Sequence, residues 1–491
     1  MTTRGVDTHP ELTAAISALP EGPGTVALFD FDGTLMHGYS AVAFLREQLR
    51  RGDFSAKQFV EMAAVMTRFG IGDIGFSAMM ATAMQFLRDT PEADFEAFGD
   101  VMYEKHIAKE IYPEARALVA AHLERGHTVA IVSSATRYQI EPAAQALGIS
   151  RIECTGLEVV DGKFTGHVLS PTCFGPGKVS AAQRICDDVG ATLADAIFYS
   201  DSDDDIELLE AVRHPRPVNA NRRLTAISEQ RGWTVERFAG RGRPGLTDWV
   251  RSIAATGSLA TSFAASLPIL ALTRSRRHMQ NFSIALFSET ASALIGLDLA
   301  VRGEEHLWEQ RPAVFVFNHQ SKADLLVMLK LLRRDVAGVG KAEIRRMPVI
   351  GQVLELGGAV LIDRKNAKSA ISAMQPLVDV MHEEGKSLII APEGTRSLST
   401  ELLPFKKGAF HIAMQAGVPI VPVVIHNSID VAPKGTFVFR PATVHVDVLP
   451  PVDTSGWQRK EIDSHIEAVR QQFLDAMGQT DDDSAAPGAA S

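Results

Sequence analysis

Asn318-His319-Gln320-Ser321-Lys322-Ala323-Asp324 lies between two apolar segments of different type. Before it, residues 314–317 (Val-Phe-Val-Phe) predict a buried strand, and after it the spacing of apolar residues over 325–332 predicts a helix. The stretch is therefore expected to form a strand-to-helix turn. At such a turn the imidazole of His319 can face a cleft while the helix begins beneath it.

The spacing of His319 and Asp324 suits general-base chemistry. An aspartate a little more than one helical turn after the histidine can bind one ring nitrogen and fix the tautomer. It also supports the positive charge that develops when the other nitrogen takes a proton. The alternative is a helix cap, because Asn, Ser and Asp are favoured near helix starts. The rest of the C-terminal half favours the catalytic interpretation.

Length and composition limit the class of protein. The chain has 491 residues, which predicts two to four domains, and 46% of them are apolar, as in a globular protein. Lys and Arg number 49 against 59 Asp and Glu, so the net charge of −10 argues against nucleic acid as the main partner. Three cysteines without a C-x-x-C pair indicate neither a disulfide framework nor a zinc site, and a reducing cytosolic compartment fits. No signal segment is expected before Leu28.

The N-terminal half predicts a site for a phosphate and a metal ion. Residues 25–29 predict a strand that leads into Asp30-Phe31-Asp32-Gly33-Thr34-Leu35. Two carboxylates two residues apart at a strand end point the same way, which suits Mg²⁺ together with a phosphate. One carboxylate can ligate and attack, while the other protonates the leaving group. A simple turn is the alternative.

Three later segments supply partners for this motif. The strand predicted at 129–132 ends at Ser133-Ser134, whose hydroxyl and backbone N–H groups can hold phosphate oxygens. Lys178 offers a positive charge for the same phosphate. The strand predicted at 196–200 ends in the acidic run 201–205, at the edge where open parallel sheets place their ligands. A cap, a solvated lysine and an exposed acidic turn are the alternatives, and the order of all four segments favours a site.

Residues 24–240 resemble a haloacid-dehalogenase-superfamily phosphatase, of the branch that contains phosphoserine phosphatases. The resemblance implies a Rossmann-like α/β domain with a helical cap at about residues 38–110 and a hairpin over 157–169 that turns at Asp161-Gly162. It implies these roles: Asp30 as the nucleophile, Asp32 as the general acid and base, Ser133 and Lys178 as phosphate ligands, and Asp30, Asp201 and the backbone carbonyl of Asp32 as Mg²⁺ ligands supported by Asp205.

The sequence departs from phosphoserine phosphatases at two places. Those enzymes carry a Glu shortly after the first motif for the substrate's ammonium, where this chain has Tyr39 and no acidic residue before Glu47. They also follow the second-motif Ser with two glycines, where this chain has Ser134-Ala135. Phosphoserine is therefore doubtful, and a cap rich in Met and Phe suits a more apolar phosphoester, although a plain core is the alternative. These cap residues are Met62, Met66, Phe69, Phe76, Met79, Met80, Met84 and Phe86.

Residues 241–300 predict a linker and a membrane-associating helical hairpin. Residues 241–245 (Arg-Gly-Arg-Pro-Gly) are typical of a linker. Residues 252–273 carry no charge and are long enough to span a bilayer, but they are too polar for full insertion. A basic cluster over 274–278 precedes a second apolar segment, 279–300. We expect two helices lying in the cytoplasmic face of the membrane, with the Arg side chains among lipid phosphates. A buried interdomain hairpin is the alternative.

Positive side chains follow the predicted strands of the C-terminal half. Lys341 and Arg364 each follow a short apolar run, and a guanidinium grips phosphate with two parallel bonds. Residues 388–390 lead into Glu393-Gly394-Thr395-Arg396. Residues 418–424 predict a last strand, with its prolines at a strand start or an edge. A single Arg is more often part of a surface ion pair, but the set describes a pocket for an anionic phosphate ester that carries a hydroxyl.

Residues 300–450 resemble the glycerolipid acyltransferase family, that of the 1-acylglycerol-3-phosphate acyltransferases. Its four blocks are H-x-x-x-x-D at 319–324, G-x-x-x-I-D-R at 358–364, E-G-T-R-S at 393–397 and V-P-I-V-P-V at 418–423. The resemblance implies that His319, oriented by Asp324, deprotonates the acceptor hydroxyl, which attacks an acyl thioester on CoA or acyl carrier protein. The substrate-binding residues that follow are Lys341, Arg364, Glu393, Gly394, Thr395 and Arg396.

The sequence therefore predicts an α/β chain with two enzymatic halves. The expected parts are a lead-in (1–23), a phosphatase domain (24–240), a linker and hairpin (241–300), an α/β acyltransferase domain (301–478) and a disordered tail (479–491). The expected products are phosphatidic acid from a lysophospholipid and an acyl thioester, and phosphate from a phosphomonoester, in the first instance a lipid phosphate. The alternatives for the N-terminal half are a phosphoserine phosphatase and a catalytically silent regulatory module.

Overall fold

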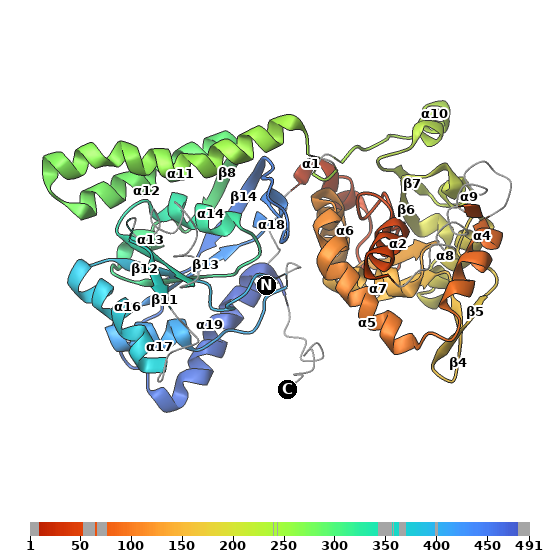
Figure 1. The fold of residues 1–491 in the computed structure, drawn as a ribbon. Coiled ribbons are helices and arrows are strands. Elements are labelled where there is room, and N and C mark those ends of the chain that lie inside the picture. The colour runs from red at the N-terminus through yellow and green to blue at the C-terminus, as the bar shows by residue number, and fades with distance from the viewer. Residues whose placement is uncertain are drawn as a thin grey trace. The chain divides into compact units, whose positions relative to one another are not determined.

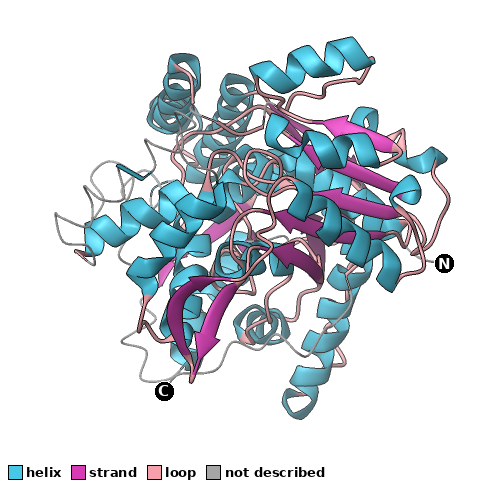
Figure 2. Ribbon diagram, turned by 90° about the vertical axis from the view of Figure 1, so that its right-hand side faces the viewer, coloured by secondary structure: helices cyan, strands magenta, loops and turns pink. Residues whose placement is uncertain are grey.

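The computed structural model describes residues 9–52, 64–65, 76–238, 240–242, 244–341, 356, 358–362, 370–397 and 401–479. The chain forms two compact units, an N-terminal unit from His9 to Arg243 and a C-terminal unit from Pro244 onward (Figure 1). In both units, strands lie between helices (Figure 2).

The N-terminal unit is built on a five-stranded parallel sheet with the order β3-β2-β1-β6-β7. The strands are β1 (Val26–Phe29), β2 (Thr128–Ser133), β3 (Arg151–Cys154), β6 (Ala196–Ser200) and β7 (His214–Pro217). The three central strands are buried throughout, as expected of a parallel sheet covered on both faces. Because these strands run in one direction, the residues that follow them, Asp30, Ser134 and Asp201, lie at the same edge of the sheet.

Alternate side chains of this sheet face two cores. Phe29 and Ile131 face one core, and Leu28 and Val132 face the other. Helices α1 (Pro10–Thr13), α6 (Pro113–Glu124) and α7 (Arg137–Ala146) cover the first core, and α8 (Pro176–Asp188), α9 (Ile206–Ala211) and α10 (Arg222–Arg231) cover the second.

A helical cap follows β1, as the sequence predicts. Its described helices are α2 (Ser40–Arg51), α4 (Phe76–Met84) and α5 (Glu92–Met102), and helix α4 packs on the hairpin of β4 (Leu157–Val160) and β5 (Lys163–Val168). The hairpin turns at Asp161 and Gly162, both with positive φ (50° and 72°), which confirms the predicted turn. Short helical turns complete the unit: η1 (Ile16–Ala18), η2 (Gln85–Leu87), η3 (Tyr103–Ile107), η4 (Ala108–Glu110), η5 (Leu193–Asp195) and η6 (Asp203–Asp205).

The C-terminal unit contains a seven-stranded sheet with the order β11-β10-β12-β9-β13-β14-β8. The strands are β8 (Leu297–Arg302), β9 (Val314–Phe317), β10 (Val336–Lys341), β11 (Val360–Ile362), β12 (Ser387–Ile390), β13 (Ile420–Ile425) and β14 (Ala442–Val448). All pairs are parallel except β13 with β14. Strand β8 pairs along β14, so the second apolar segment is helical only to Ile295 and the sheet begins before residue 300.

Pro422 lies inside β13 rather than at a strand start or an edge, where the sequence analysis placed it. It is paired with Val316 of β9, so β13 is an interior strand. On the other side, Val423 pairs with Val448 and Ile420 with Val452, so three residues (449–451) stand opposite two (421–422). This bulge accommodates a residue that has no N–H group to donate.

Helices cover both faces of this sheet. One face packs against α14 (Ala323–Leu332) and the hairpin of α11 (Leu246–Thr273) and α12 (Arg276–Ile295). The other face packs against α16 (Ala370–Glu384), α17 (Gly408–Ala416) and α19 (Ile462–Met477). The remaining short elements are α13 (His306–Glu309), α18 (Ser428–Val431) and η8 (Arg459–Glu461).

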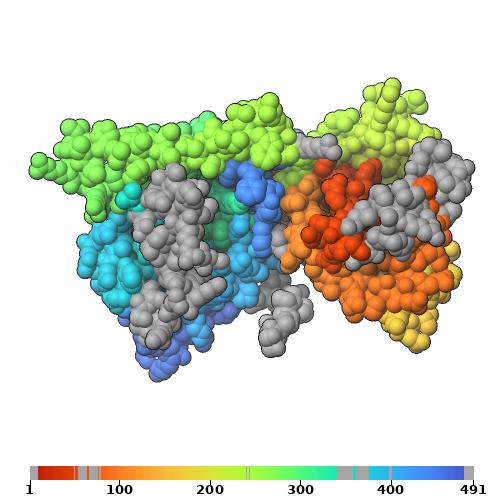
Figure 3. Space-filling model, in the orientation of Figure 1, coloured from red at the N-terminus to blue at the C-terminus, as the bar shows by residue number. Residues whose placement is uncertain are grey.

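In the hairpin, α11 buries small side chains, and large apolar side chains are exposed. The buried face of α11 consists of Ser252, Ala255, Ser258, Ser262 and Ser266. Large exposed apolar side chains of the hairpin are Leu246, Trp249, Val250, Ile253, Leu267, Leu272 and Phe282. Among the described residues α11 is the one helix long and apolar enough to cross a membrane. The hairpin lies along the outside of its unit (Figure 3).

Candidate active sites

Lys178 joins two of the predicted site residues in the N-terminal unit. Its Nζ donates to Asp30 Oδ1 at 2.9 Å and to Asp205 Oδ2 at 2.8 Å. Ser200 Oγ donates to the same Asp205 carboxylate at 2.6 Å. All four side chains are buried. Asp205 therefore fixes the lysine beside Asp30, where Lys178 reaches any phosphate that Asp30 contacts.

Asp32, the second carboxylate of the motif, is held by Ser40 at the start of α2. The backbone N–H of Ser40 donates to Asp32 Oδ1 at 2.7 Å, and its Oγ donates to Oδ2 at 3.0 Å. Gln139 of α7 in turn donates to Ser40 Oγ at 3.0 Å. Burial raises the pKa of Asp32 to about 7 despite these bonds. A carboxyl group that titrates near neutral pH suits proton transfer in both directions.

Asp201 lies against the turn that follows Asp30. Thr34 Oγ1 donates to Asp201 Oδ1 at 3.4 Å. Gly33 has φ +78°, and a Cβ atom there would lie 2.1 Å from Asp201 Oδ2, so both the backbone angle and the space require glycine. Burial, with added repulsion from Asp30 and Asp205, raises the pKa of Asp201 to about 8.

This excess of negative charge fits a divalent cation. Within the described ranges, no group of three or more His, Cys, Asp or Glu side chains is arranged to hold a metal ion alone. Ser40 donates to both oxygens of Asp32, and Asp205 accepts from Lys178 and Ser200, whereas Lys178 binds Oδ1 of Asp30. A cation would therefore take Asp30, Asp201 and backbone or water oxygens, which hard cations accept. Such a cation would stabilise the ionised form of Asp201, which burial and the neighbouring carboxylates disfavour.

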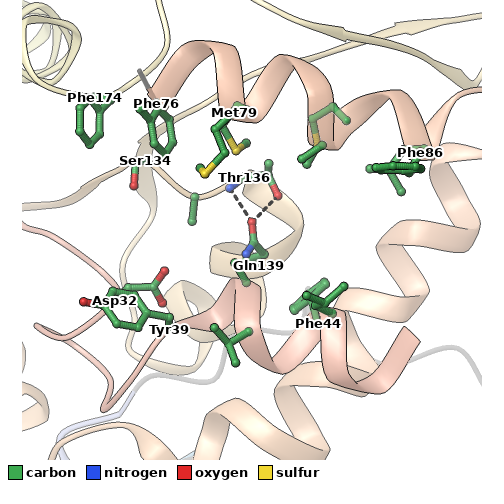
Figure 4. Close-up of a pocket in the computed structure, with 18 of the residues that line it drawn as sticks. Asp32, Tyr39, Phe44, Phe76, Met79, Phe86, Ser134, Thr136, Gln139 and Phe174 are labelled. Carbon is green, nitrogen blue, oxygen red and sulfur yellow. Dashed lines mark hydrogen bonds between the residues drawn. The ribbon is translucent and has the colours of Figure 1, made fainter. Parts of the chain in front are cut away.

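The two serines after β2 have different positions. Ser133 is buried, and its Oγ accepts a hydrogen bond from the backbone N–H of Ala135 at 3.3 Å. Ser134 lies in the wall of a cavity of about 340 Å³, on the same side as Asp32 (Figure 4). The cavity extends from these polar groups under the cap.

His319 and Asp324 form a dyad in the C-terminal unit. The imidazole Nδ1–H donates to Asp324 Oδ2 at 2.7 Å, because a carboxylate can only accept. Nε2 is therefore the basic nitrogen. The His319 side chain is 27% exposed and that of Asp324 is fully buried, so solvent and substrate can reach the ring but not the carboxylate.

The carboxylate of Asp324 accepts four hydrogen bonds. Besides His319, the backbone N–H groups of Gln320 and Ser321 donate to Oδ2, each at 2.8 Å. Ser428 Oγ donates to Oδ1. One carboxylate therefore satisfies the turn that begins α14 and orients the imidazole, so the geometry of a helix cap and the geometry expected of a general base occur together.

Glu393 connects two loops through its carboxylate. The backbone N–H groups of His319 and Leu403 donate to it at 2.6 and 3.2 Å. Burial raises its pKa to about 8. Gly394 has φ +75°, and a Cβ atom there would lie 2.8 Å from Lys406 Nζ, so glycine leaves room for this lysine. Thr395 is exposed.

Arg396 provides an unsatisfied donor close to other cations. Its Nη1 is buried and has no hydrogen-bond partner among the described residues. Lys322 Nζ donates to the backbone oxygen of Thr436 at 3.1 Å and lies 3.9 Å from the centre of the Phe437 ring. Burial, followed by the charge of Arg396, lowers the pKa of Lys322. Lys434 Nζ donates to the Arg396 carbonyl at 3.2 Å.

Several predicted residues lie outside the described part of the chain. They are Arg364, the side chain of Lys341, and the cap residues Met62, Met66 and Phe69. Sequence reasoning also missed Ser40, Gln139, Ser428 and the cationic partner Lys322. No motif spacing identifies Ser428, which is 104 residues from Asp324. A lysine three residues after His319 was visible in the sequence but has no spacing rule of its own.

Fold and site geometry define a chain with two α/β domains, one of the hydrolase type and one of the acyltransferase type. Residues 27–210 match the haloacid dehalogenase-like hydrolase family model, and residues 298–426 match the acyltransferase family model. The chain is 36% identical over 200 residues to 1-acyl-sn-glycerol-3-phosphate acyltransferase alpha of Mus musculus, covering 40% of this chain and 70% of that protein. The chain therefore belongs to the 1-acyl-sn-glycerol-3-phosphate acyltransferase family, with a haloacid-dehalogenase-like domain in the same polypeptide.

Two further comparisons complete this relationship. The chain is 36% identical over 181 residues to the 1-acyl-sn-glycerol-3-phosphate acyltransferase of Limnanthes douglasii, covering 37% of this chain and 64% of that enzyme. The N-terminal half aligns with a phosphoserine phosphatase solved as a phospho-aspartyl intermediate analogue, with 21% identity, a TM-score of 0.34, and coverage of 44% of this chain and 93% of that structure.

Proposed function

We propose that the C-terminal unit transfers an acyl group from acyl-CoA or acyl carrier protein to 1-acylglycerol-3-phosphate, giving phosphatidic acid. The carrying observation is the His319–Asp324 dyad, in which Asp324 is buried and holds Nδ1 while the ring remains accessible. The acyltransferase relatives support the substrate class.

The geometry supports a direct transfer. His319 Nε2 takes the proton of the acceptor hydroxyl as its oxygen attacks the thioester carbonyl, and the buried Asp324 stabilises the imidazolium. The C–S bond then breaks, and the imidazolium returns the proton to the thiolate. No covalent acyl-enzyme is needed. Arg396 Nη1, which has no hydrogen-bond partner among the described residues, binds the acceptor phosphate together with Lys322.

Product analysis tests this proposal. Purified full-length chain is mixed with 1-acylglycerol-3-phosphate and either acyl-CoA or acyl carrier protein carrying the same acyl group. Phosphatidic acid formation with at least one donor is the expected result, and the two donors are ranked by kcat/KM. Free fatty acid as the sole product with both donors would contradict acyl transfer to this acceptor.

We propose that the N-terminal unit is a Mg²⁺-dependent phosphatase that acts on a phosphomonoester. A lipid phosphate is the first candidate substrate. Asp30 attacks phosphorus, the ester P–O bond breaks, and Asp32 protonates the leaving alcohol; water then releases phosphate from Asp30 and returns a proton to Asp32. Lys178, 2.9 Å from Asp30, neutralises the phosphate oxygens. Bound Mg²⁺ would supply positive charge at Asp30 and Asp201.

A catalytically silent module is the competing proposal for this unit. The ion pair of Lys178 with Asp30 and the burial of Asp201 among other carboxylates support catalysis. Buried ionisable groups are energetically unfavourable and are typical of active sites, whereas a docking domain does not require them. Release of inorganic phosphate from lysophosphatidate, phosphatidate and phosphoserine, measured with Mg²⁺ present, decides between them. A silent module predicts no release that exceeds the rate of an Asp30→Asn variant.

We propose further that the hairpin of α11 and α12 docks the chain on the cytoplasmic face of a membrane. Serines make up most of the buried face of α11, whereas Ile253, Leu267 and Leu272 are 67%, 46% and 85% exposed. This distribution is the reverse of that in a soluble hairpin and suits an apolar surface. The exposed cations Arg274 and Arg276 suit lipid phosphates.

Vesicle flotation tests the docking proposal. The double substitution Leu267→Asp and Leu272→Asp is expected to release the protein from vesicles that contain anionic phospholipid. The control, Val160→Asp, places the same charge on an exposed apolar residue of β4 outside the hairpin and should leave flotation unchanged. Equal flotation of wild type and the double variant would remove the proposal.

A further inference from the structure

The cavity under the cap is apolar along most of its length. Its lining includes Phe44, Phe76, Met79, Met80, Met84 and Phe86. These side chains come from α2, α4 and the turn after α4, and Phe86 lies on the side opposite Ser134 and Asp32 (Figure 4). Cap methionines and phenylalanines among the described residues therefore line a cavity.

The polar end of this cavity borders the proposed phosphatase site at Asp32 and Ser134. Asp32, Ser134 and Asp204 belong to its lining. Phe174, from the loop before α8, stacks on Phe76 of the cap with ring centres 4.4 Å apart and an interplanar angle of 7°. This stack joins the cap to the α/β domain beside the polar end. A phosphate at Asp30 would thus project its ester group into the apolar part.

The apolar part offers no carboxylate to pair with an ammonium group among the described lining residues. The acidic members of the lining, Asp32 and Asp204, both belong to the phosphatase end. Glu47, the first acidic residue after the Asp30 motif, lies outside the lining and receives two hydrogen bonds from Arg50, at 2.6 and 2.7 Å. Burial of an unpaired ammonium group is costly, so an amino-acid phosphate fits poorly.

The volume of the cavity limits the number of aliphatic chains that it can hold. A cavity of about 150 Å³ lined by apolar side chains holds benzene, so about 340 Å³ corresponds to roughly fourteen carbon atoms. One aliphatic chain of a phospholipid fills this space. Two such chains would need about twice the volume.

We propose that this cavity binds the aliphatic chain of a single-chain lipid phosphate. The N-terminal unit then hydrolyses monoacylglycerol phosphates in preference to two-chain lipid phosphates and to amino-acid phosphates. Water is consumed, the P–O ester bond breaks, and a monoacylglycerol and inorganic phosphate are released. This inference rests on the proposed phosphatase function. It also means that the two units compete for the same lysophosphatidate, because the C-terminal unit uses it as acyl acceptor.

The test measures phosphate release by the full-length chain with Mg²⁺ and without an acyl donor. The substrates are glycerol 3-phosphate, monoacylglycerol phosphates of increasing chain length below their micellar concentration, phosphatidic acid and phosphoserine. We expect kcat/KM to rise about two- to fourfold per methylene, and then to level off near roughly fourteen carbons. Phosphatidic acid and phosphoserine are expected to be the poorer substrates.

A matched pair of variants tests where the aliphatic chain of the substrate binds. Ala83 of α4 lines the cavity, whereas Ala81 on the same helix is exposed and outside the lining. Ala83→Trp fills part of the cavity and should move the chain-length optimum to shorter chains. Ala81→Trp should reproduce the wild-type profile. The same dependence of kcat/KM on chain length in both variants would show that the aliphatic chain binds elsewhere.

A binding measurement provides a readout without turnover. Decyl phosphate is titrated calorimetrically into the Asp30→Asn variant, where burial of the chain should give a negative heat-capacity change. Adding Ala83→Trp should weaken binding at least tenfold, and adding Ala81→Trp should not.

The outcomes separate this inference from the proposed function. Phosphate release that depends on Asp30 but not on chain length keeps the phosphatase and overturns the chain-binding cavity. Equal kcat/KM for phosphatidic acid, or preference for phosphoserine, also overturns it. No release from any phosphomonoester overturns both proposals.

Discussion

At the strand ends of the N-terminal unit, Lys178 binds two buried carboxylates, those of Asp30 and Asp205, with Asp32 and Asp201 in the same site. In the C-terminal unit, the single carboxylate of Asp324 is bound by an imidazole and three further donors. Both sites bury carboxylates beside a parallel strand. In the first, burial together with repulsion from Asp30 and Asp205 raises the pKa of Asp201 to about 8. The second satisfies its carboxylate completely. The difference teaches that burial leaves the carboxylates of the first site with fewer compensating protein donors than the carboxylate of the second, which is why we propose a cation only for the first.

The largest expected effect comes from Asp30→Asn. This change removes the nucleophile and keeps its shape, so phosphate release should fall about 10⁴-fold or more, in the range seen when a nucleophile is deleted. Acyl transfer by the same protein should stay within about twofold of wild type, because the two sites share no residue. Colorimetric phosphate and radiolabelled lipid assays measure the two reactions. Loss of both phosphate release and acyl transfer in this variant would show that the two sites are not independent.

His319→Ala tests the second site in the opposite direction. Loss of the general base should lower kcat of acyl transfer about 10³-fold, within the usual range for such groups. Phosphate release should be unchanged. Asp324→Asn should be nearly as damaging, because an amide in place of the carboxylate favours the wrong imidazole tautomer. An Asp324→Asn enzyme with normal activity would remove the dyad from the mechanism.

Chelation of metal ions tests the difference in charge between the two sites. Treatment with EDTA should lower phosphate release at least about 10²-fold, since the cation supplies charge that the protein lacks at Asp30 and Asp201. Added Mg²⁺ should restore it. Acyl transfer, measured in the same sample, should not respond. Metal-independent phosphatase activity would show that Lys178 alone compensates the carboxylates.

Lys322→Met tests the cationic partner that the structure places near Arg396. Loss of one charge-assisted contact to the acceptor phosphate should raise KM for 1-acylglycerol-3-phosphate about tenfold and change kcat little. Lys407→Met is the control, because Lys407 is an exposed lysine that pairs with Asp463. An equal KM in wild type and Lys322→Met would place the phosphate elsewhere.

The smallest effect concerns stability rather than catalysis. Buried His122 donates through Nδ1 to His127 at 2.8 Å and accepts from Tyr199 Oη through Nε2 at 3.0 Å, because Nε2 of His127 donates to a carbonyl oxygen. Burial lowers the pKa of His122 from 6.5 to about 3. The folded state therefore binds fewer protons than the unfolded state between these values, and stability falls as pH drops below 6.5, by up to about 1.4 kcal/mol per pH unit.

The measurement compares unfolding of wild type and His122→Gln between neutral pH and about pH 5.5. The stability advantage of wild type should shrink as pH falls, because the glutamine does not titrate. An advantage that is constant with pH would show that His122 is already charged in the folded state, contrary to its surroundings.

The sequence predicted the parts whose signals are local. Apolar runs located β1, β2, β6 and β9, and the Asp-Gly pair located the turn of the β4–β5 hairpin. Alternation and turn chemistry act over a few residues, so they can be recognised without the fold. Edge strands β3 and β7 were not predicted, and β8 was included in a helical segment, because partly buried strands carry weaker apolar patterns.

The same limit applies to the sites. The spacing of His319 and Asp324 predicted a bond that the structure contains. The Asp30 motif likewise predicted that carboxylates lie together at a strand end. Ser40 at Asp32 and Ser428 at Asp324 could not be predicted, because serines are common and these bonds depend on how distant segments pack. Pro422 inside β13 depends on a bulge supplied by another part of the chain.

By itself the sequence determined which residue types stand at the strand ends, since a strand-to-turn transition and a five-residue spacing are encoded locally. Only the tertiary structure decided that Asp205 accepts a hydrogen bond from Lys178, and that cap phenylalanines and methionines line a cavity beside Asp32. The physical reason is that hydrogen bonds, charge balance and enclosed volume arise between segments far apart in the chain, and are set by packing rather than by neighbouring residues.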